Sequence, residues 1–131
     1  MIREMTRGLL IALLGLQAGV SMAAPPPACF VPQKKFDNRF IGNWQIAEWN
    51  VRYSIVGKGR EICLYGRDAQ GDEWFEISEL KWNGKVLSAT FLMPSTQWRT
   101  HSRLSLVEAD RIRDDYTSKE GKQTDYWTRR K

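Results

Sequence analysis

The sequence predicts an all-β fold, an antiparallel up-and-down meander of seven or eight strands closed into a small barrel. Two features of residues 39–131 carry this prediction. Short segments rich in β-branched and aromatic residues follow one another with turn signals between them at near-regular spacing. Within several segments, apolar and polar residues alternate with a period of two, as expected of strands with one buried face. A sequential meander of this kind avoids exposed edges most simply by closing on itself.

Each strand is predicted between two turn signals made mostly of glycine, proline, asparagine or aspartate. The strongest turn signal is Asn83-Gly84, because both residues tolerate the positive φ that a two-residue type I′ hairpin requires. The stretch 49–51 is a turn, a bulge or the middle of one long bent strand. In chain order, the predicted strands are 39–49, 52–56, 60–67, 73–81, 85–92, 98–107, 111–118 and 122–129.

Alternation also predicts which residues face the barrel interior. Asp114 and Asp115 point to opposite sides of their strand, and we interpret both as surface charges that balance Arg111 and Arg113 across strands. The residues expected to face inward are Leu87, Ala89, Phe91 and Met93 in one segment, Trp98, Leu104 and Leu106 in the next, and Ile112 and Tyr116 in the third.

The first 23 residues are predicted to be a secretory signal peptide. Arg3 and Arg7 precede an uncharged, largely apolar run over 8–20, and small residues follow it. The run is too short to span a bilayer, which needs about 20 apolar residues. Removal of residues 1–23 lowers the net charge from +5 to +4. The mature protein is therefore expected to be periplasmic or secreted.

Residues 24–38 are predicted to be a proline-rich extended lead-in, because Pro25, Pro26, Pro27 and Pro32 fit neither a helix nor a paired strand. The only two cysteines, Cys29 and Cys63, lie in the mature part of the chain. An even count in an exported protein indicates a disulfide. This bond would hold the lead-in against the barrel domain, residues 39–131. A lipid anchor at Cys29 is the alternative.

The first predicted strand opens with the Gly-x-Trp motif Gly42-Asn43-Trp44. In this position the motif resembles the start of lipocalin and wider calycin barrels, and the chain looks like the shorter, lipocalin-like secreted barrels of bacteria. The resemblance implies that Trp44 plugs one end of the barrel. It also implies that an arginine near the last strand, Arg129 or Arg130, packs across the tryptophan ring. A lysozyme inhibitor is another exported class of this size, but a net charge of +4 would repel a cationic lysozyme.

Binding of a small ligand is the predicted function. Six tryptophans are present, and aromatic side chains with a few polar groups are typical of small-molecule sites. The expected ligand is apolar or amphipathic and lies in the barrel. We expect Trp74, Glu76, Phe91 and Trp98 to line it.

A protein-binding module of the bacterial envelope, such as an inhibitor, an immunity protein or an assembly accessory, is the alternative. The barrel core would then be filled, and outward aromatic residues would form the contact. The residues expected to do so are Trp49, Trp82 and Trp127. An open lumen favours the first function, and a packed interior with an exposed aromatic patch favours the second.

Enzymatic activity is not expected, and neither is a cofactor or a metal. The single histidine, His101, falls on the polar face of its strand. Two cysteines and one histidine are a poor ligand set for a metal. Nucleic acid is not an expected partner of an exported chain. The basic end, Arg129-Arg130-Lys131, is either a solvated tail or a weak contact with an anionic membrane surface or an acidic partner.

Overall fold

The computed structural model describes residues 28–131, so the predicted signal peptide and the start of the lead-in lie outside the described residues. The described chain is all-β, which confirms the predicted fold class. Its elements are β1 (Cys29–Phe30), η1 (Asn38–Phe40), β2 (Gly42–Ile46), η2 (Ala47–Trp49), β3 (Val51–Lys58), β4 (Glu61–Asp68), β5 (Glu73–Trp74), β6 (Glu76–Trp82), β7 (Leu87–Met93), β8 (Trp98–Glu108), β9 (Arg111–Ser118) and β10 (Gly121–Arg129). Within residues 28–131, no helix has the length and apolar character needed to cross a bilayer.

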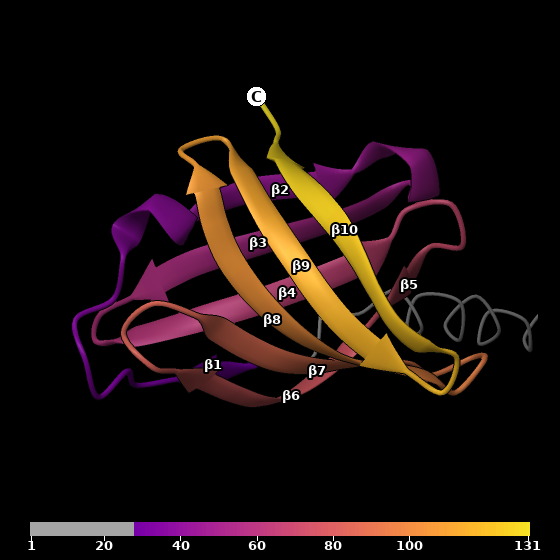
Figure 1. Cartoon of the computed structure of the whole chain (residues 1–131), viewed down its shortest axis with the longest axis horizontal. Helices are drawn as coiled ribbons and strands as arrows, with labels where there is room; N and C mark the ends of the chain where they lie inside the picture. The colour runs from indigo at the N-terminus through magenta and orange to yellow at the C-terminus, as the bar shows by residue number, and fades with distance from the viewer. Residues whose placement is uncertain (1–27) are drawn as a thin grey trace, which may run out of the picture.

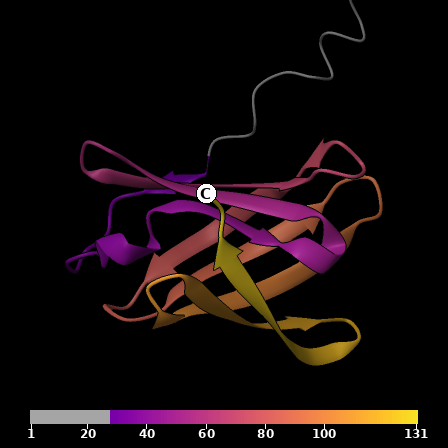
Figure 2. The ribbon, with the colours of Figure 1, turned by 90° about the horizontal axis from the view of Figure 1, so that it is seen from above.

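The strands form one antiparallel sheet in the order β1-β4-β3-β2-β10-β9-β8-β7-β6, with β5 paired to β4. From β2 onward, each ladder joins two strands that follow one another along the chain, with the exception of the ladder between β10 and β2. β10 pairs with β2 through Thr128↔Gln45 and Arg129↔Trp44. Figure 1 shows β8, β9 and β10 crossing in front of β2, β3 and β4, and Figure 2 shows the sheet curving round between them. The sheet is nearly closed into a barrel.

The gap in the barrel lies between β4 and β6. β5 follows β4 for two register pairs, Arg67↔Trp74 and Asp68↔Glu73, and the backbone N–H of Phe75 then donates to Gly66 O at 2.9 Å. Beyond this point β6 diverges from β4 and pairs with β7. The N-terminal strand β1 contacts both β4 and β6, so the lead-in covers the gap.

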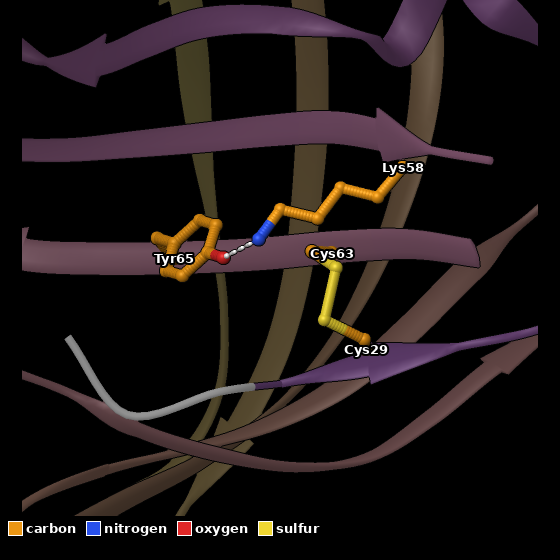
Figure 3. The surroundings of a disulfide bond; sticks show 4 residues. All are labelled: Cys29, Lys58, Cys63 and Tyr65. Carbon is orange, nitrogen blue, oxygen red and sulfur yellow. Dashed lines mark hydrogen bonds between the residues drawn. A yellow bond between two sulfur atoms is a disulfide. The ribbon is translucent and has the colours of Figure 1, made fainter.

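The predicted disulfide holds β1 in this place. Cys29 and Cys63 are a register pair of β1 and β4 and are joined by a disulfide, as Figure 3 shows beside the hydrogen bond from Lys58 to Tyr65. The backbone N–H of Leu64 also donates to Ala28 O at 2.8 Å. The cross-link therefore fixes the lead-in to the barrel wall, as the sequence predicted.

Two local predictions differ from the structure. Asn83-Gly84 is part of a four-residue loop between Trp82 and Leu87 rather than a two-residue type I′ turn. Gly84 has a positive φ and Asn83 does not. Instead, the Asn83 carboxamide oxygen accepts from the backbone N–H groups of Lys85 and Val86 at 2.9 and 2.7 Å. The ambiguous stretch 49–51 is a turn: η2 ends at Trp49, and Asn50 adopts the left-handed conformation that begins β3.

Trp44 and the residues before it close one end of the barrel. The Trp44 ring is completely buried, and its Nε1 donates to Phe40 O at 2.9 Å. Phe36, Phe40 and Trp82 pack together beside it, with ring centres 4.8 to 5.8 Å apart. Phe36 of the lead-in, together with Phe40 and Trp82 of the barrel domain, thus fills this end, which we call the closed end.

Arg129 lies across Trp44 at the closed end. Its guanidinium carbon is 4.2 Å from the centre of the indole ring, and its N–H groups donate to the carbonyls of Arg39, Ile41 and Ala109. Arg130 instead continues the backbone pairing with Asn43. Arg129 is thus the arginine that packs across Trp44, and the alternative of a freely solvated tail does not hold for this residue, whose side chain is part of the fold.

Candidate ligand-binding cavity

The other end of the barrel contains a cavity of about 580 Å³. Its mouth lies among η2, the end of β4 and the connections β7–β8 and β9–β10, which contribute Trp49, Asp68, Thr96 and Glu120. These connections gather at the right-hand end of Figure 1, away from the closed end. Deeper in the barrel, the lining comes from inward residues of β3, β7, β8, β9 and β10. A cavity of this size can hold one small molecule.

Stacked aromatic rings form the floor of the cavity. Tyr53 of β3 lies flat on Trp127 of β10, with ring centres 3.7 Å apart and planes only 4° apart. Phe91 meets Tyr53 edge-on at 5.5 Å, and Phe75 meets Phe91 edge-on at 5.8 Å. Tyr53, Phe75 and Phe91 line the cavity, and Trp127 is completely buried beneath them. The floor is therefore apolar, and its rings come from β3, β7 and β10 and from the residue between β5 and β6.

A glycine makes room for this aromatic floor. A β-carbon at Gly66 of β4 would come within 3.0 Å of the rings of both Tyr53 and Phe75. Such contacts are tighter than nine in ten real β-carbon contacts, so a ring would have to move by a few tenths of an ångström to admit a side chain. The place of Gly66 opposite Tyr53 in the ladder thus lets the two rings pack closely on β4.

Asp114 of β9 is the buried charge-bearing group of the cavity. It is only 4% exposed. Its Oδ2 accepts a hydrogen bond from Trp127 Nε1 at 3.2 Å, and its Oδ1 has no hydrogen-bond partner among the described residues. Burial raises the pKa of Asp114 from 3.8 to about 7, against the opposing hydrogen bond from Trp127, and the nearby charge of Asp125 raises it further.

The interpretation of Asp114 as a surface charge is therefore wrong. The strand alternation contained the necessary signal, because Asp114 shares its face with Ile112 and Tyr116, both predicted to point inward. The residue type indicated the surface instead, since carboxylates are seldom buried without a partner. Asp115, on the opposite face, is partly exposed and ion-paired with Arg113 at 3.0 Å.

Three further carboxylates line the cavity, from Asp68, Glu120 and Asp125. Asp125 is the register partner of Asp114 across the β9–β10 ladder, so two acidic side chains lie opposite one another on the inner face. Tyr116 lies beside them, and its hydroxyl donates to Gln123 Oε1 at 2.6 Å. Burial, followed by the charge of Asp125, raises the pKa of Tyr116. The polar part of the cavity is thus acidic.

Of the four predicted lining residues, the structure brings two together. Phe91 and Trp98 line the cavity, and Trp74 and Glu76 do not. Trp74 lies in β5 with Arg67 5.8 Å above its ring, and Glu76 is exposed on the outer face. Phe75 and Ile77, which alternate with Trp74 and Glu76 along the chain, pack on the core instead. The sequence did place Trp74 and Glu76 on one face, but that face points outward.

The predicted aromatic contact for a protein partner does not form one surface. Trp82 is 7% exposed and Trp127 is fully buried, whereas Trp49 is 59% exposed at the cavity mouth. Trp82 faces inward because a bulge between Ser78 and Lys81 shifts the register of β6, so residues beyond the bulge change sides. Sequence alternation could not locate this bulge.

A second hollow, of about 790 Å³, lies on the outer face of β7 to β10 and is lined by polar side chains of both signs. At its centre, the buried Thr90 donates to Glu79 and lies 2.8 Å from His101 Nδ1. Glu79 occupies the bulge with a positive φ. Thr90 is only 3% exposed, so the hydrogen bonds of its hydroxyl serve to join β6, β7 and β8. We consider the interior cavity the better candidate site, because it combines apolar walls with a few polar groups.

Searches of protein-family models, curated proteins and solved structures return no match to this chain. The class defined by the fold and the site is a small antiparallel barrel that is closed at one end by a tryptophan and hollow at the other.

Proposed function

We propose that this protein is an exported, non-catalytic binding module that holds a small apolar or amphipathic ligand in its barrel cavity. The cavity above the stacked rings of Tyr53 and Trp127 is the observation that carries the proposal. An aromatic floor takes up apolar surface, and the carboxylates near the mouth orient a polar group.

Export is supported by two independent features. The first 23 residues have the pattern of a secretory signal peptide. The Cys29–Cys63 disulfide suits an oxidising compartment such as the periplasm or the extracellular space. A role in binding rather than catalysis is supported by the position of His101, which lies on the outer face and away from the cavity lining.

Native mass spectrometry of the mature protein, purified from its exported state, tests the proposal. We expect a bound small-molecule mass that disappears on denaturation. Thr100→Phe, which adds a ring to a cavity-lining position, should abolish it. Thr128→Phe, which adds the same ring at an exposed position of β10, is the matched control and should retain it.

The proposal would be overturned if the wild-type protein carries no bound small molecule and also binds none of the probes in the titrations described below. This result would favour the alternative of an envelope protein-binding module. The single exposed tryptophan of the mouth, Trp49, would then be the first contact residue to replace.

A further inference from the structure

The charge of the cavity is opposite to the charge of the protein. The full chain has a net charge of +5, yet the charged residues that line the cavity are Asp68, Asp114, Glu120 and Asp125, with no lysine or arginine among the lining residues. Within residues 28–131, none of these four carboxylates takes part in an ion pair. A concave, low-dielectric site lined by one sign of charge concentrates ligands of the opposite sign.

The pair Asp114 and Asp125 is the least explained part of this arrangement. Like charges directly opposite each other across a ladder destabilise a sheet, and this pair lies on the inner face of β9 and β10. Asp114 is also only 4% exposed, and its Oδ1 has no hydrogen-bond partner within residues 28–131. An unpaired buried acceptor costs free energy, and a bound cation would favour the ionised form of both carboxyl groups.

The rings around the cavity suit an organic cation. Tyr53, Phe75, Phe91 and Trp98 present aromatic surface to the same space as the carboxylates. Ammonium groups bind favourably over such rings, most favourably over tryptophan. The protein already makes one such contact at the rim, where Lys119 Nζ lies 5.7 Å from the centre of the Trp98 ring.

We propose that the cavity selects a cationic amphiphile, an alkyl or aryl amine or quaternary ammonium compound, with its apolar part on the aromatic floor and its positive group beside Asp114 and Asp125. This inference rests on the proposed function and adds the sign of the ligand's charge. It excludes fatty acids and other anionic amphiphiles as the preferred ligands.

Three probes with the same ten-carbon chain test the charge selection: decyltrimethylammonium, 1-decanol and decanoate. Binding to the mature, disulfide-bonded protein would be measured by tryptophan fluorescence or calorimetry at 0.15 M salt. We expect decyltrimethylammonium to bind roughly tenfold tighter than 1-decanol, a difference of about 1.4 kcal/mol, and decanoate to bind most weakly. Calcium chloride alone is the fourth titrant.

Asp125→Asn is the informative variant, because it removes one carboxylate of the pair and keeps the size of the side chain. It should weaken decyltrimethylammonium binding severalfold and leave 1-decanol binding unchanged. Glu108→Gln, which makes the same charge change at an exposed end of β8, is the matched control and should affect neither probe. Glu120→Gln at the mouth provides a second test if Asp125→Asn does not fold.

The outcomes separate this inference from the proposed function. Equal affinities for the three probes would retain a ligand-binding cavity and overturn its charge selection. Tighter binding of decanoate would do the same. Failure of all three probes to bind would count against the proposed function as well. Calcium binding that depends on Asp125, without binding of decyltrimethylammonium, would overturn the organic cation in favour of an inorganic one.

Discussion

The Arg129 guanidinium carbon lies 4.2 Å from the centre of the Trp44 ring, and this contact joins the last strand of the barrel to the first. The same guanidinium donates to the carbonyls of Arg39 in η1, of Ile41 between η1 and β2, and of Ala109 in the β8–β9 turn. One side chain thus connects three parts of the closed end that are distant in sequence. The opposite end has no such closure among its described lining residues and contains the cavity.

Arg129→Ala should lower the free energy of unfolding by about 2–4 kcal/mol, because it removes the ring contact and leaves several carbonyls without a donor. Urea denaturation followed by fluorescence would measure the loss. Arg130→Ala is the control, since the backbone N–H of Arg130 still donates to Asn43 O at 2.8 Å. Equal losses for the two variants would show that Arg129 has no special closing role.

Gly42→Ala should destabilise the protein through Arg129. Gly42 has a φ of 151°, and a β-carbon there would collide with the Arg129 guanidinium. In the Arg129→Ala background the collision disappears, so the double-mutant cycle should show a coupling of about 0.5–3 kcal/mol. Gly121→Ala is the matched control, because Gly121 also has a positive φ but open space around it. The loss of stability caused by Gly121→Ala should be the same with or without the Arg129 side chain.

Asp114 should make the protein less stable as the pH rises from about 4 to about 7. The folded state keeps a proton on Asp114 up to a pKa of about 7, whereas the unfolded chain loses it near 3.8. The unfolded state therefore binds fewer protons in this window, and the free energy of unfolding falls as pH increases. The full effect, above pH 7, is on the order of 4 kcal/mol at most.

Asp114→Asn removes this titration, so its stability relative to the wild type should increase between pH 4 and pH 8. Urea midpoints across this range would measure the difference. Asp115→Asn is the control, because a hydrogen bond from Thr124, followed by that from Arg113, lowers the pKa of Asp115 from 3.8. Its titration therefore lies below this range, and its stability relative to the wild type should stay constant between pH 4 and pH 8. A flat difference between the wild type and Asp114→Asn would contradict the buried, protonated carboxyl.

Loss of the disulfide should cost about 3–4 kcal/mol, the chain-entropy estimate for cysteines separated by 34 residues. The variant Cys29→Ser with Cys63→Ser removes the cross-link without leaving a free thiol. We expect faster amide hydrogen exchange in β1 and along the edge of β4 that it covers, with β8 to β10 little changed. Uniform acceleration across all strands would show instead that the bond supports the whole barrel.

Most of the fold could be predicted because its signals are local. Turn residues and period-two alternation depend only on neighbours in sequence, and each of the eight predicted segments contains or overlaps strands of the structure. The segment 73–81 is divided between β5 and β6, where the chain leaves β4. The cysteine pairing also followed from the sequence, because two cysteines allow only one intramolecular bond.

The cavity could be predicted only in part. Phe91 and Trp98 were found from alternation, but Trp74 and Glu76 lie on the outer face because Phe75 and Ile77 take the inner positions. Asp114 was missed because its residue type outweighed its place on the inner face. Trp82 was misplaced because the bulge between Ser78 and Lys81 reverses the facing of the residues beyond it.

The sequence alone determined the antiparallel meander and its strand order, since these depend on patterns within short stretches of chain. It also determined the pairing of the two cysteines. Which end of the barrel is filled was decided by tertiary packing, because Phe36, Phe40, Trp82 and Arg129 come from distant parts of the chain. The same packing left the other end hollow and brought Asp114 opposite Asp125 inside it. Contacts between residues remote in sequence set this geometry, and no local pattern contains them.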